Sequence, residues 1–262
     1  MQTKDSKPLD FIEYTIKSDR LILWIVVFGL AVELAFILLD LIFTYTQWIP
    51  VIELRKIFDM TRERSVGTWL STTLSFFAGL TLLVIFFMVR EGGAPKRETI
   101  SWLILALFFI YMSVDDCAFI HERSGDFVKR MVSYGTLPFG LSIIVARFPT
   151  YYWQLIMGPF FAAMGLFMLC FLWKRFRVDR LRKYVILSLL GLGSAMFLDF
   201  VEGISRVVKK LAMITGMSER SVVHILRLTE ESLEMVSMLL LLFAFLSYLA
   251  IMLKNKRIRI SE

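Results

Sequence analysis

The chain has 262 residues, of which 57% are hydrophobic, and its mean hydropathy is +0.68. Soluble domains have a lower apolar share, about 45–50%, so this composition excludes an ordinary soluble protein and indicates a membrane protein. The net charge of +7 is explained by basic residues beside the membrane segments, which attract anionic lipids. We therefore expect membrane lipids as partners and no nucleic acid.

Six apolar runs reach the length that a membrane-spanning helix needs, about 20 residues. All six tryptophans lie at the ends of these runs, where an indole ring prefers the level of the lipid headgroups. The pattern predicts an all-α, polytopic transmembrane bundle that forms one integral membrane domain over residues 1–262. Its six helices are expected near 21–45, 69–89, 100–120, 152–173, 184–204 and 219–253.

One further apolar stretch, residues 137–146, leaves a seventh span open. It is short and bracketed by Pro138 and Pro149, which favours an interfacial or re-entrant segment. The loops on the side of the membrane that contains this stretch are long and amphipathic, whereas those on the opposite side are short and basic. In the last long loop, Gly203 and Gly216 punctuate helical stretches, and Ser218 is expected to cap the final helix.

Basic residues predict the orientation. With both termini inside, the inner segments carry 17 Lys and Arg residues and the outer loops carry 13. The sequence KRFRVDRLRK at 174–183 is the strongest inner signal. We therefore expect a multi-pass protein of the cell inner (plasma) membrane, with cytoplasmic termini.

Carboxylates and imidazoles inside apolar helix ends are the candidate functional residues. A charge near the bilayer centre costs about 2.5–3.5 kcal/mol on insertion scales, so ionisable residues in spans mark functional sites. The third, fifth and sixth helices all have an acidic end at the outer face, because odd-numbered helices finish where the sixth begins. The predicted metal ligands are Asp115, Asp116, His121, Glu122, Asp199, Glu202, His224, Glu230, Glu231 and Glu234. The first helix adds Glu33 and Asp40.

Helical angles of 100° per residue predict that these side chains converge. On continuous helices, Asp115 and Glu122 share one stripe. His224, Arg227, Glu231 and Glu234 share another, and Asp199, Glu202 and Arg206 share a third.

Three uses of such a cluster remain open. Carboxylates with one or two imidazoles suit a divalent Fe, Mn or Zn ion, which could support a metal-dependent enzyme acting on a lipid-phase substrate. The Glu-x-x-His motif of ferritin-like di-iron proteins is absent from the sequence. A network of carboxylate–Arg pairs would instead fit a non-catalytic subunit of a larger membrane complex. Groups at several depths would fit proton- or cation-coupled transport. The sequence assigns no catalytic residue and no organic cofactor.

Four motifs carry a resemblance: FDMTRERSVGTWLS at 58–71, SVDDCAFIHE at 113–122, LDFVEG at 198–203 and EESLEM at 230–235. In these the chain resembles a group of uncharacterised bacterial multi-pass membrane proteins. Relatives tend to have Asp-Glu in place of Asp115-Asp116, and Pro in place of Gly67. The resemblance implies a shared helical fold and a shared acidic site, without an established reaction.

Overall fold

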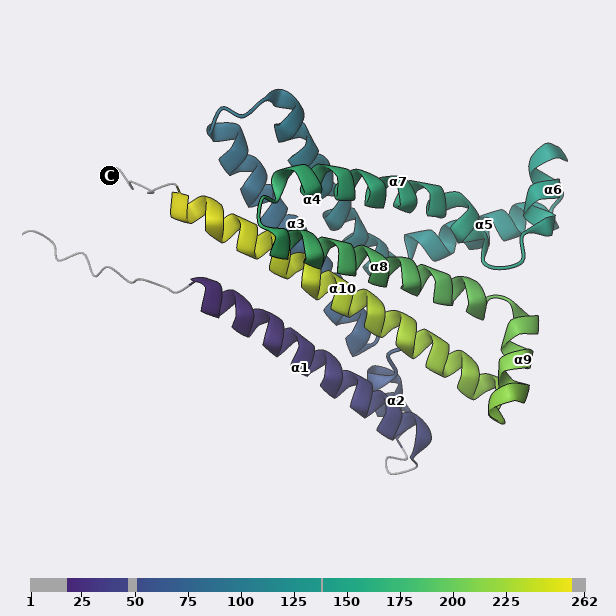
Figure 1. Cartoon of the computed structure of the whole chain (residues 1–262). Coiled ribbons are helices and arrows are strands. Elements are labelled where there is room, and N and C mark those ends of the chain that lie inside the picture. Colours follow the sequence, from purple (N-terminus) through teal and green to yellow (C-terminus); the bar gives the residue numbers. More distant parts are fainter. Residues whose placement is uncertain (1–17, 47–50, 138, 256–262) are drawn as a thin grey trace, which may run out of the picture.

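The computed structural model describes residues 18–46, 51–137 and 139–255, and all regular secondary structure in these ranges is helical (Figure 1). The long helices are α1 (Ser18–Tyr45), α3 (Val66–Glu91), α4 (Lys96–Ala118), α7 (Tyr152–Arg175), α8 (Asp179–Glu202) and α10 (Glu219–Asn255). The shorter helices are α2 (Ile52–Phe58), α5 (Ile120–Ser133), α6 (Phe139–Arg147) and α9 (Ser205–Thr215).

The prediction of six helices long and apolar enough to cross a membrane is confirmed for the described residues. Each long helix contains a span of at least 23 residues, with a mean hydropathy between 1.7 and 2.8 in its most apolar window. The nine residues of α6 rise about 14 Å, which is less than half of the roughly 30 Å of hydrocarbon, so α6 is too short to be a seventh span. The 37 residues of α10 rise about 55 Å, so this helix extends beyond the hydrocarbon.

The central helix of the bundle is α10, which packs against α1, α3 and α8 (Figure 1). Its side chains Met235, Leu239 and Phe245 are buried in the main apolar core. In the neighbouring α3–α4 pair, a Cβ added at Gly79 would lie 2.8 Å from Ile110 Cγ1 and 3.1 Å from Ile110 N. Glycine therefore allows the close approach of α3 and α4, which contributes dispersion contacts where no water is available to drive association.

The four short helices lie at one end of the bundle, opposite the start of α1 and the end of α10 (Figure 1). We call this end the loop end. Its helix α2 exposes Ile52, Leu54 and Ile57, and α9 exposes Met213 and Ile214. Apolar side chains exposed on short helices beside the spans suit the boundary between lipid headgroups and acyl chains.

Local capping sets where helices begin at the loop end. Ser218 Oγ accepts a hydrogen bond of 3.1 Å from the backbone N–H of Ser221, as the sequence predicts. The expected helix over 100–120 is corrected, because α4 ends at Ala118 and Phe119 adopts a left-handed conformation with φ of 54°. Asp115 stabilises this break by accepting from the otherwise unpaired N–H of His121 in the first turn of α5.

The prediction that these residues share faces of continuous helices is therefore wrong at two places. Asp115 and Glu122 lie on different helices, α4 and α5, on either side of Phe119. In the same way α8 ends at Glu202, so that Arg206 belongs to α9. Each break re-aims the chain at the membrane boundary, where backbone groups can again find water or polar side chains.

Candidate functional site

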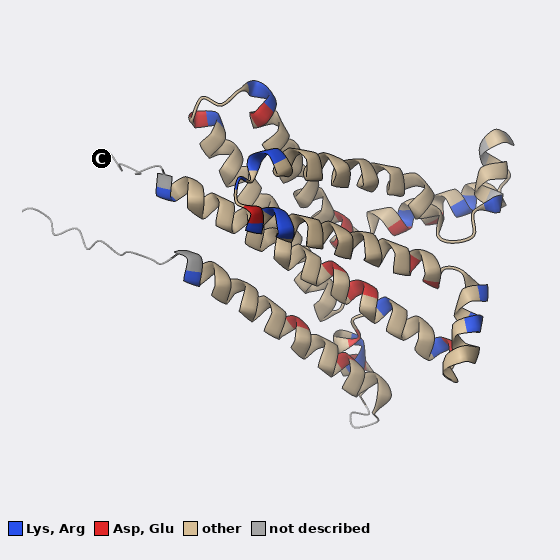
Figure 2. Ribbon diagram, in the orientation of Figure 1, with Lys and Arg blue, Asp and Glu red and all other residues tan. Residues whose placement is uncertain are grey.

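Acidic side chains gather inside the bundle toward the loop end, on α4, α5, α8 and α10. Figure 2 shows acidic positions on α8 and α10 within the bundle, and basic positions concentrated near its ends. This distribution matches the expectation that the acidic ends of the third, fifth and sixth spans lie at the same side of the bundle.

Asp115 and His121 form a close pair in this cluster. Asp115 is 1% exposed, and its Oδ2 lies 2.6 Å from His121 Nδ1. Burial lowers the pKa of His121, but the hydrogen bond and the charge of Asp115 outweigh burial and raise this pKa above its ordinary value. Trp153 packs edge-to-face on the imidazole at 4.9 Å. The pair fixes the ring and leaves Nε2 as the nitrogen available to a ligand.

Carboxylates from α10 approach Asp116 of α4. Glu231 and Glu234 both interact electrostatically with Asp116, and Glu234 also interacts with Glu231. Ser71 of α3 donates a hydrogen bond of 2.8 Å to Asp116 Oδ2. Three helices therefore meet at Asp116, and a hydroxyl satisfies one of its two oxygens.

Asp199 of α8 links the cluster to α7. Gln154 Nε2 donates a hydrogen bond of 2.6 Å to Asp199 Oδ2. Asp199 also interacts electrostatically with Glu202 and Glu230. An amide donor therefore offsets part of the repulsion among these carboxylates.

Arg227 of α10 completes a network with Glu202 and Tyr151. Its Nη2 and Nε lie 2.9 and 3.2 Å from Glu202 Oε1, and Tyr151 Oη donates to Glu202 Oε2 at 2.5 Å. Burial and the adjacent Glu202 carboxylate raise the pKa of Tyr151 to about 12, so the hydroxyl stays protonated and donates. Both oxygens of Glu202 therefore have donors.

A cavity of about 540 Å³ opens onto this cluster. We call it the acidic cavity. Its wall carries six carboxylates but only two cationic side chains, so its field favours cations. The charged residues are Glu63, Glu122, Asp126, Asp199, Glu230 and Glu231, with Lys129 and Arg227.

Glu63 and Glu122 form a carboxyl pair at the edge of this cavity. Partial burial, a hydrogen bond with Glu63 and the charge of Glu63 raise the pKa of Glu122 to about 7. Two carboxyl groups can share a hydrogen bond only when one of them holds a proton. Protonation or a bound cation can therefore relieve the repulsion between them.

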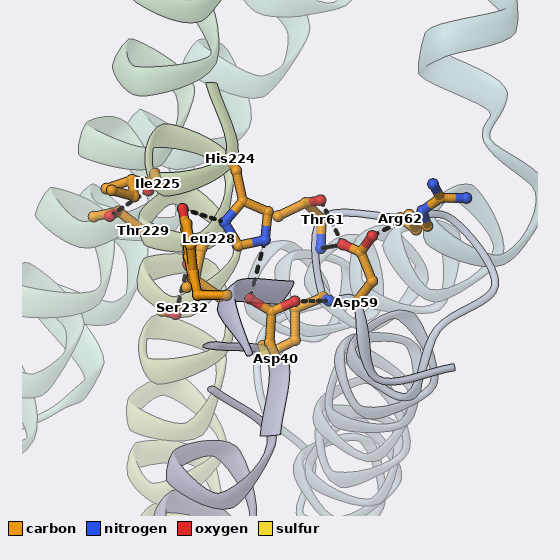
Figure 3. Close-up of polar contacts among 11 residues, drawn as sticks. Asp40, Asp59, Thr61, Arg62, His224, Ile225, Leu228, Thr229 and Ser232 are labelled. Carbon is orange, nitrogen blue, oxygen red and sulfur yellow. Dashed lines mark hydrogen bonds and ion pairs between the residues drawn. The ribbon is translucent and has the colours of Figure 1, made fainter. Parts of the chain in front are cut away.

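A second group at the loop end contains two carboxylates and an imidazole: Asp40 of α1, Asp59 of the α2–α3 connection and His224 of α10. One ligand atom from each lies within 4.8 Å of the other two. Figure 3 shows His224 above Asp40, with Asp59 beside them. We call this group the Asp40–Asp59–His224 triad.

Two atoms of the triad are buried without a hydrogen-bond partner in the described part of the chain: Asp40 Oδ2 and His224 Nε2. They lie 3.1 Å apart, close enough for an ion pair but without hydrogen-bond alignment (Figure 3). Asp40 is 0% exposed, and its Oδ1 accepts a hydrogen bond of 3.1 Å from the backbone N–H of Met60. His224 Nδ1 contacts Tyr45 Oη at 3.3 Å. When Nδ1 carries the proton, Nε2 retains the lone pair that binds metals.

Asp59 is held in place by its own segment. Its Oδ1 accepts from Thr61 N–H at 3.2 Å and from Thr61 Oγ1 at 2.6 Å, and Arg62 Nε lies 2.7 Å from its Oδ2 (Figure 3). A carboxylate offers about four lone-pair positions. Asp59 can therefore keep these partners and still accept an ion.

The triad borders a cavity of about 740 Å³, which we call the basic pocket. Asp59 and His224 belong to its wall, together with five cationic side chains from α2, the α2–α3 connection and α10. These are Arg55, Lys56, Arg62, Arg220 and Arg227. The basic pocket shares Thr61 and Arg227 with the acidic cavity.

Residues 21–249 match a domain of unknown function, DUF8692. The chain belongs to this family. The match runs from the start of α1 almost to the end of α10, so the DUF8692 domain includes the acidic cavity and the triad. No curated protein matches the chain, and no solved structure does.

Within this DUF8692 chain, nine of the ten predicted ligands belong to the acidic cluster, and His224 lies instead in the triad with Asp40 and Asp59. Metal binding by the nine stays a prediction. Sequence reasoning did not single out Asp59, Tyr151 or Gln154. Asp59 has a local signal, since it stands in a polar segment between two apolar helices, whereas Tyr151 and Gln154 become relevant only through contacts with distant helices.

Proposed function

We propose that this membrane protein binds a divalent metal ion at its loop end, in the Asp40–Asp59–His224 triad. The observation that carries the proposal is a pair of buried ligand atoms, Asp40 Oδ2 and His224 Nε2, which face each other at 3.1 Å without a hydrogen-bond partner among the described residues, with Asp59 close by. Leaving buried polar atoms unpaired costs about 1–3 kcal/mol each. An ion between them removes this cost.

The ligand types favour particular metals. One imidazole with two carboxylates suits Zn, Mn or Fe, whereas Ca and Mg prefer oxygen ligands alone. At tetrahedral zinc with bonds near 2.0–2.1 Å, ligand atoms lie about 3.3 Å apart. Ligand atoms that now lie within 4.8 Å of one another can reach this spacing through side-chain rotation.

Three protein ligands leave a coordination position open, which is typical of catalytic rather than structural sites. That position would face the basic pocket, whose wall includes Asp59 and His224. A metal there would act as a Lewis acid on a substrate at the headgroup level. We propose this as the way in which the protein would act on an interfacial substrate.

The test is metal analysis of protein purified without chelators, comparing wild type with Asp40→Asn and His224→Gln. Both variants preserve side-chain size, and we expect metal affinity to fall by at least about 100-fold, since even outer-shell changes cost 10–100-fold. Glu33→Gln is the matched control, because Glu33 is equally buried on α1 and lies outside the triad. Loss of metal in Glu231→Gln but not in Asp40→Asn would move the site to the acidic cavity.

A second candidate function rests on the acidic cavity, whose six carboxylates favour uptake of a cation or proton. Glu33 lies near the middle of α1, and both of its carboxylate oxygens are buried without a hydrogen-bond partner in the part of the chain that the structure describes. Proton- or cation-coupled transport requires groups at such depths. Cation flux in proteoliposomes that falls in both Glu230→Gln and Glu33→Gln would favour transport, and unchanged flux in either would count against it.

We also propose that the loop end faces outward, with the protein in the inner membrane and both termini in the cytoplasm. The basic 174–183 segment at the opposite end supports this orientation. Single-cysteine variants Lys183→Cys and Met217→Cys should be labelled by a membrane-impermeant reagent from opposite sides. Labelling of both from one side would reject the topology.

A further inference from the structure

The structure assigns to the basic pocket a phosphate group as its ligand, either free or as part of a lipid headgroup, bound between Lys56, Arg220 and the triad. This inference names the ligand class of the proposed metal site and therefore rests on that proposal. Its own support comes from the charge, position and neighbours of the pocket wall.

The wall of the basic pocket is predominantly cationic. Five cationic side chains face one carboxylate, that of Asp59. Two of these cations are already engaged, because Arg62 pairs with Asp59 and Arg227 pairs with Glu202. Lys56 and Arg220 have no ion-pair partner within the described ranges, so they remain the cations with which an anion can pair.

The two cations come from different helices that line the basic pocket. Lys56 lies on α2, and Arg220 lies in the first turn of α10, one helical turn before His224. An anion between them would also lie beside Asp59 and His224. A metal ion held by the triad would add positive charge on the third side, and a phosphate has enough oxygens to contact all three.

The wall of the basic pocket also suits the level at which the phosphate groups of lipids lie. Its wall includes Ile52 of α2, which is 59% exposed, and the same short helix exposes Leu54 and Ile57. A helix with apolar side chains on its surface and Arg55 and Lys56 beside the pocket suits the boundary between acyl chains and headgroups. A volume of about 740 Å³ is within the range of small-molecule sites.

The first experiment measures binding of inorganic phosphate to the metal-loaded, detergent-purified full chain by calorimetry. We expect saturable binding that weakens at least tenfold in Lys56→Gln/Arg220→Gln, because each change removes a charge-assisted hydrogen bond. Lys209→Gln/Lys210→Gln on α9 is the matched control, since it removes the same charge from the loop end outside the pocket. Equal weakening by both double variants would reduce the effect to general surface charge and overturn the inference.

The second experiment separates free phosphate from a headgroup. Wild type and the two double variants are placed in vesicles of phosphatidylcholine with or without phosphatidic acid, and thermal stability is measured. Stabilisation by phosphatidic acid that only Lys56→Gln/Arg220→Gln abolishes indicates a headgroup, whereas binding of inorganic phosphate alone indicates a soluble ligand. Absence of both responses would overturn the inference.

Asp40→Asn distinguishes this inference from the proposal beneath it. If the wild-type protein binds metal but neither inorganic phosphate nor phosphatidic acid, the phosphate inference is refuted and the metal proposal stands. Wild type that binds phosphate through Lys56 and Arg220, but no metal, refutes the metal proposal and leaves an anion site. Loss of metal together with at least tenfold weaker phosphate binding in Asp40→Asn supports both.

Discussion

The acidic cavity and the basic pocket lie at the same end of one bundle, yet the carboxylates beside them differ in their hydrogen bonding. In the acidic cluster, Asp116 accepts from Ser71 and Asp199 accepts from Gln154. In the triad, Asp40 Oδ2 has a neighbouring imidazole, but within the described ranges no donor is aligned with it. Neutral donors thus offset part of the repulsion in the acidic cluster, whereas an unsatisfied carboxylate oxygen beside an imidazole is the stronger sign of an ion site.

The largest expected effect concerns the network that separates the two regions. Arg227→Ala leaves Glu202, whose side chain is 5% exposed, with a buried charge and only Tyr151 as donor. We expect the free energy of unfolding to fall by about 2–3 kcal/mol, less than for a fully buried pair because the Arg227 side chain is partly exposed. Thermal and denaturant unfolding in detergent would measure it.

The matched control for that prediction is Arg206→Ala, which removes an exposed arginine of α9 at the same end. Glu231→Gln provides the second comparison, since the largest charge interactions of Glu231 are with the carboxylates of Asp116 and Glu122. If Arg227→Ala were as stable as Arg206→Ala, the network would not hold the helices together. The acidic cluster would then be free to serve mainly in binding.

The smallest expected effect is a pH dependence at the rim of the acidic cavity. The pKa of Glu122 rises from an ordinary 4.5 to about 7 in the folded chain, so folding favours its protonated form. This stabilisation is complete below pH 4.5 and is lost as the pH rises through 7. Since the partly buried Glu122 remains accessible to solvent, we expect less than about 1 kcal/mol.

Glu122→Gln imitates the protonated side chain and should flatten this part of the profile. The measurement is the melting temperature between pH 5 and 8 for wild type and Glu122→Gln. Asp126→Asn, another acid of α5 in the cavity wall, is the control and should leave the slope unchanged. A wild-type slope that persists in Glu122→Gln would assign the titration to another group.

Hydropathy predicted the six spans because each span needs about 20 apolar residues whatever its neighbours are. The order of the spans also indicated which helix ends meet, which is why nine predicted ligands lie in one cluster. Phe119 was missed because a left-handed aromatic residue has no common sequence signal. The break at Phe119 is stabilised by the Asp115 carboxylate, which accepts a hydrogen bond from the first turn of α5.

The environment of His224 differs from the one that the pattern of its own helix predicts. A stripe of residues 224, 227, 231 and 234 on α10 suggests one shared environment. The helix is enclosed by α1, α3 and α8, so residues at different heights meet different partners. His224 meets Asp40 near the tip of α10, whereas Glu234 interacts with carboxylates deeper in the bundle.

Thr61 and Arg227 belong to the walls of both cavities, so the two cavities share part of one wall. The guanidinium that faces Glu202 on one side also contributes its charge to the other. An anion that draws Arg227 away would leave Glu202 short of a donor and make the acidic side more attractive to cations. Filling the two compartments would then be cooperative, and oppositely charged ligands would each increase the affinity for the other.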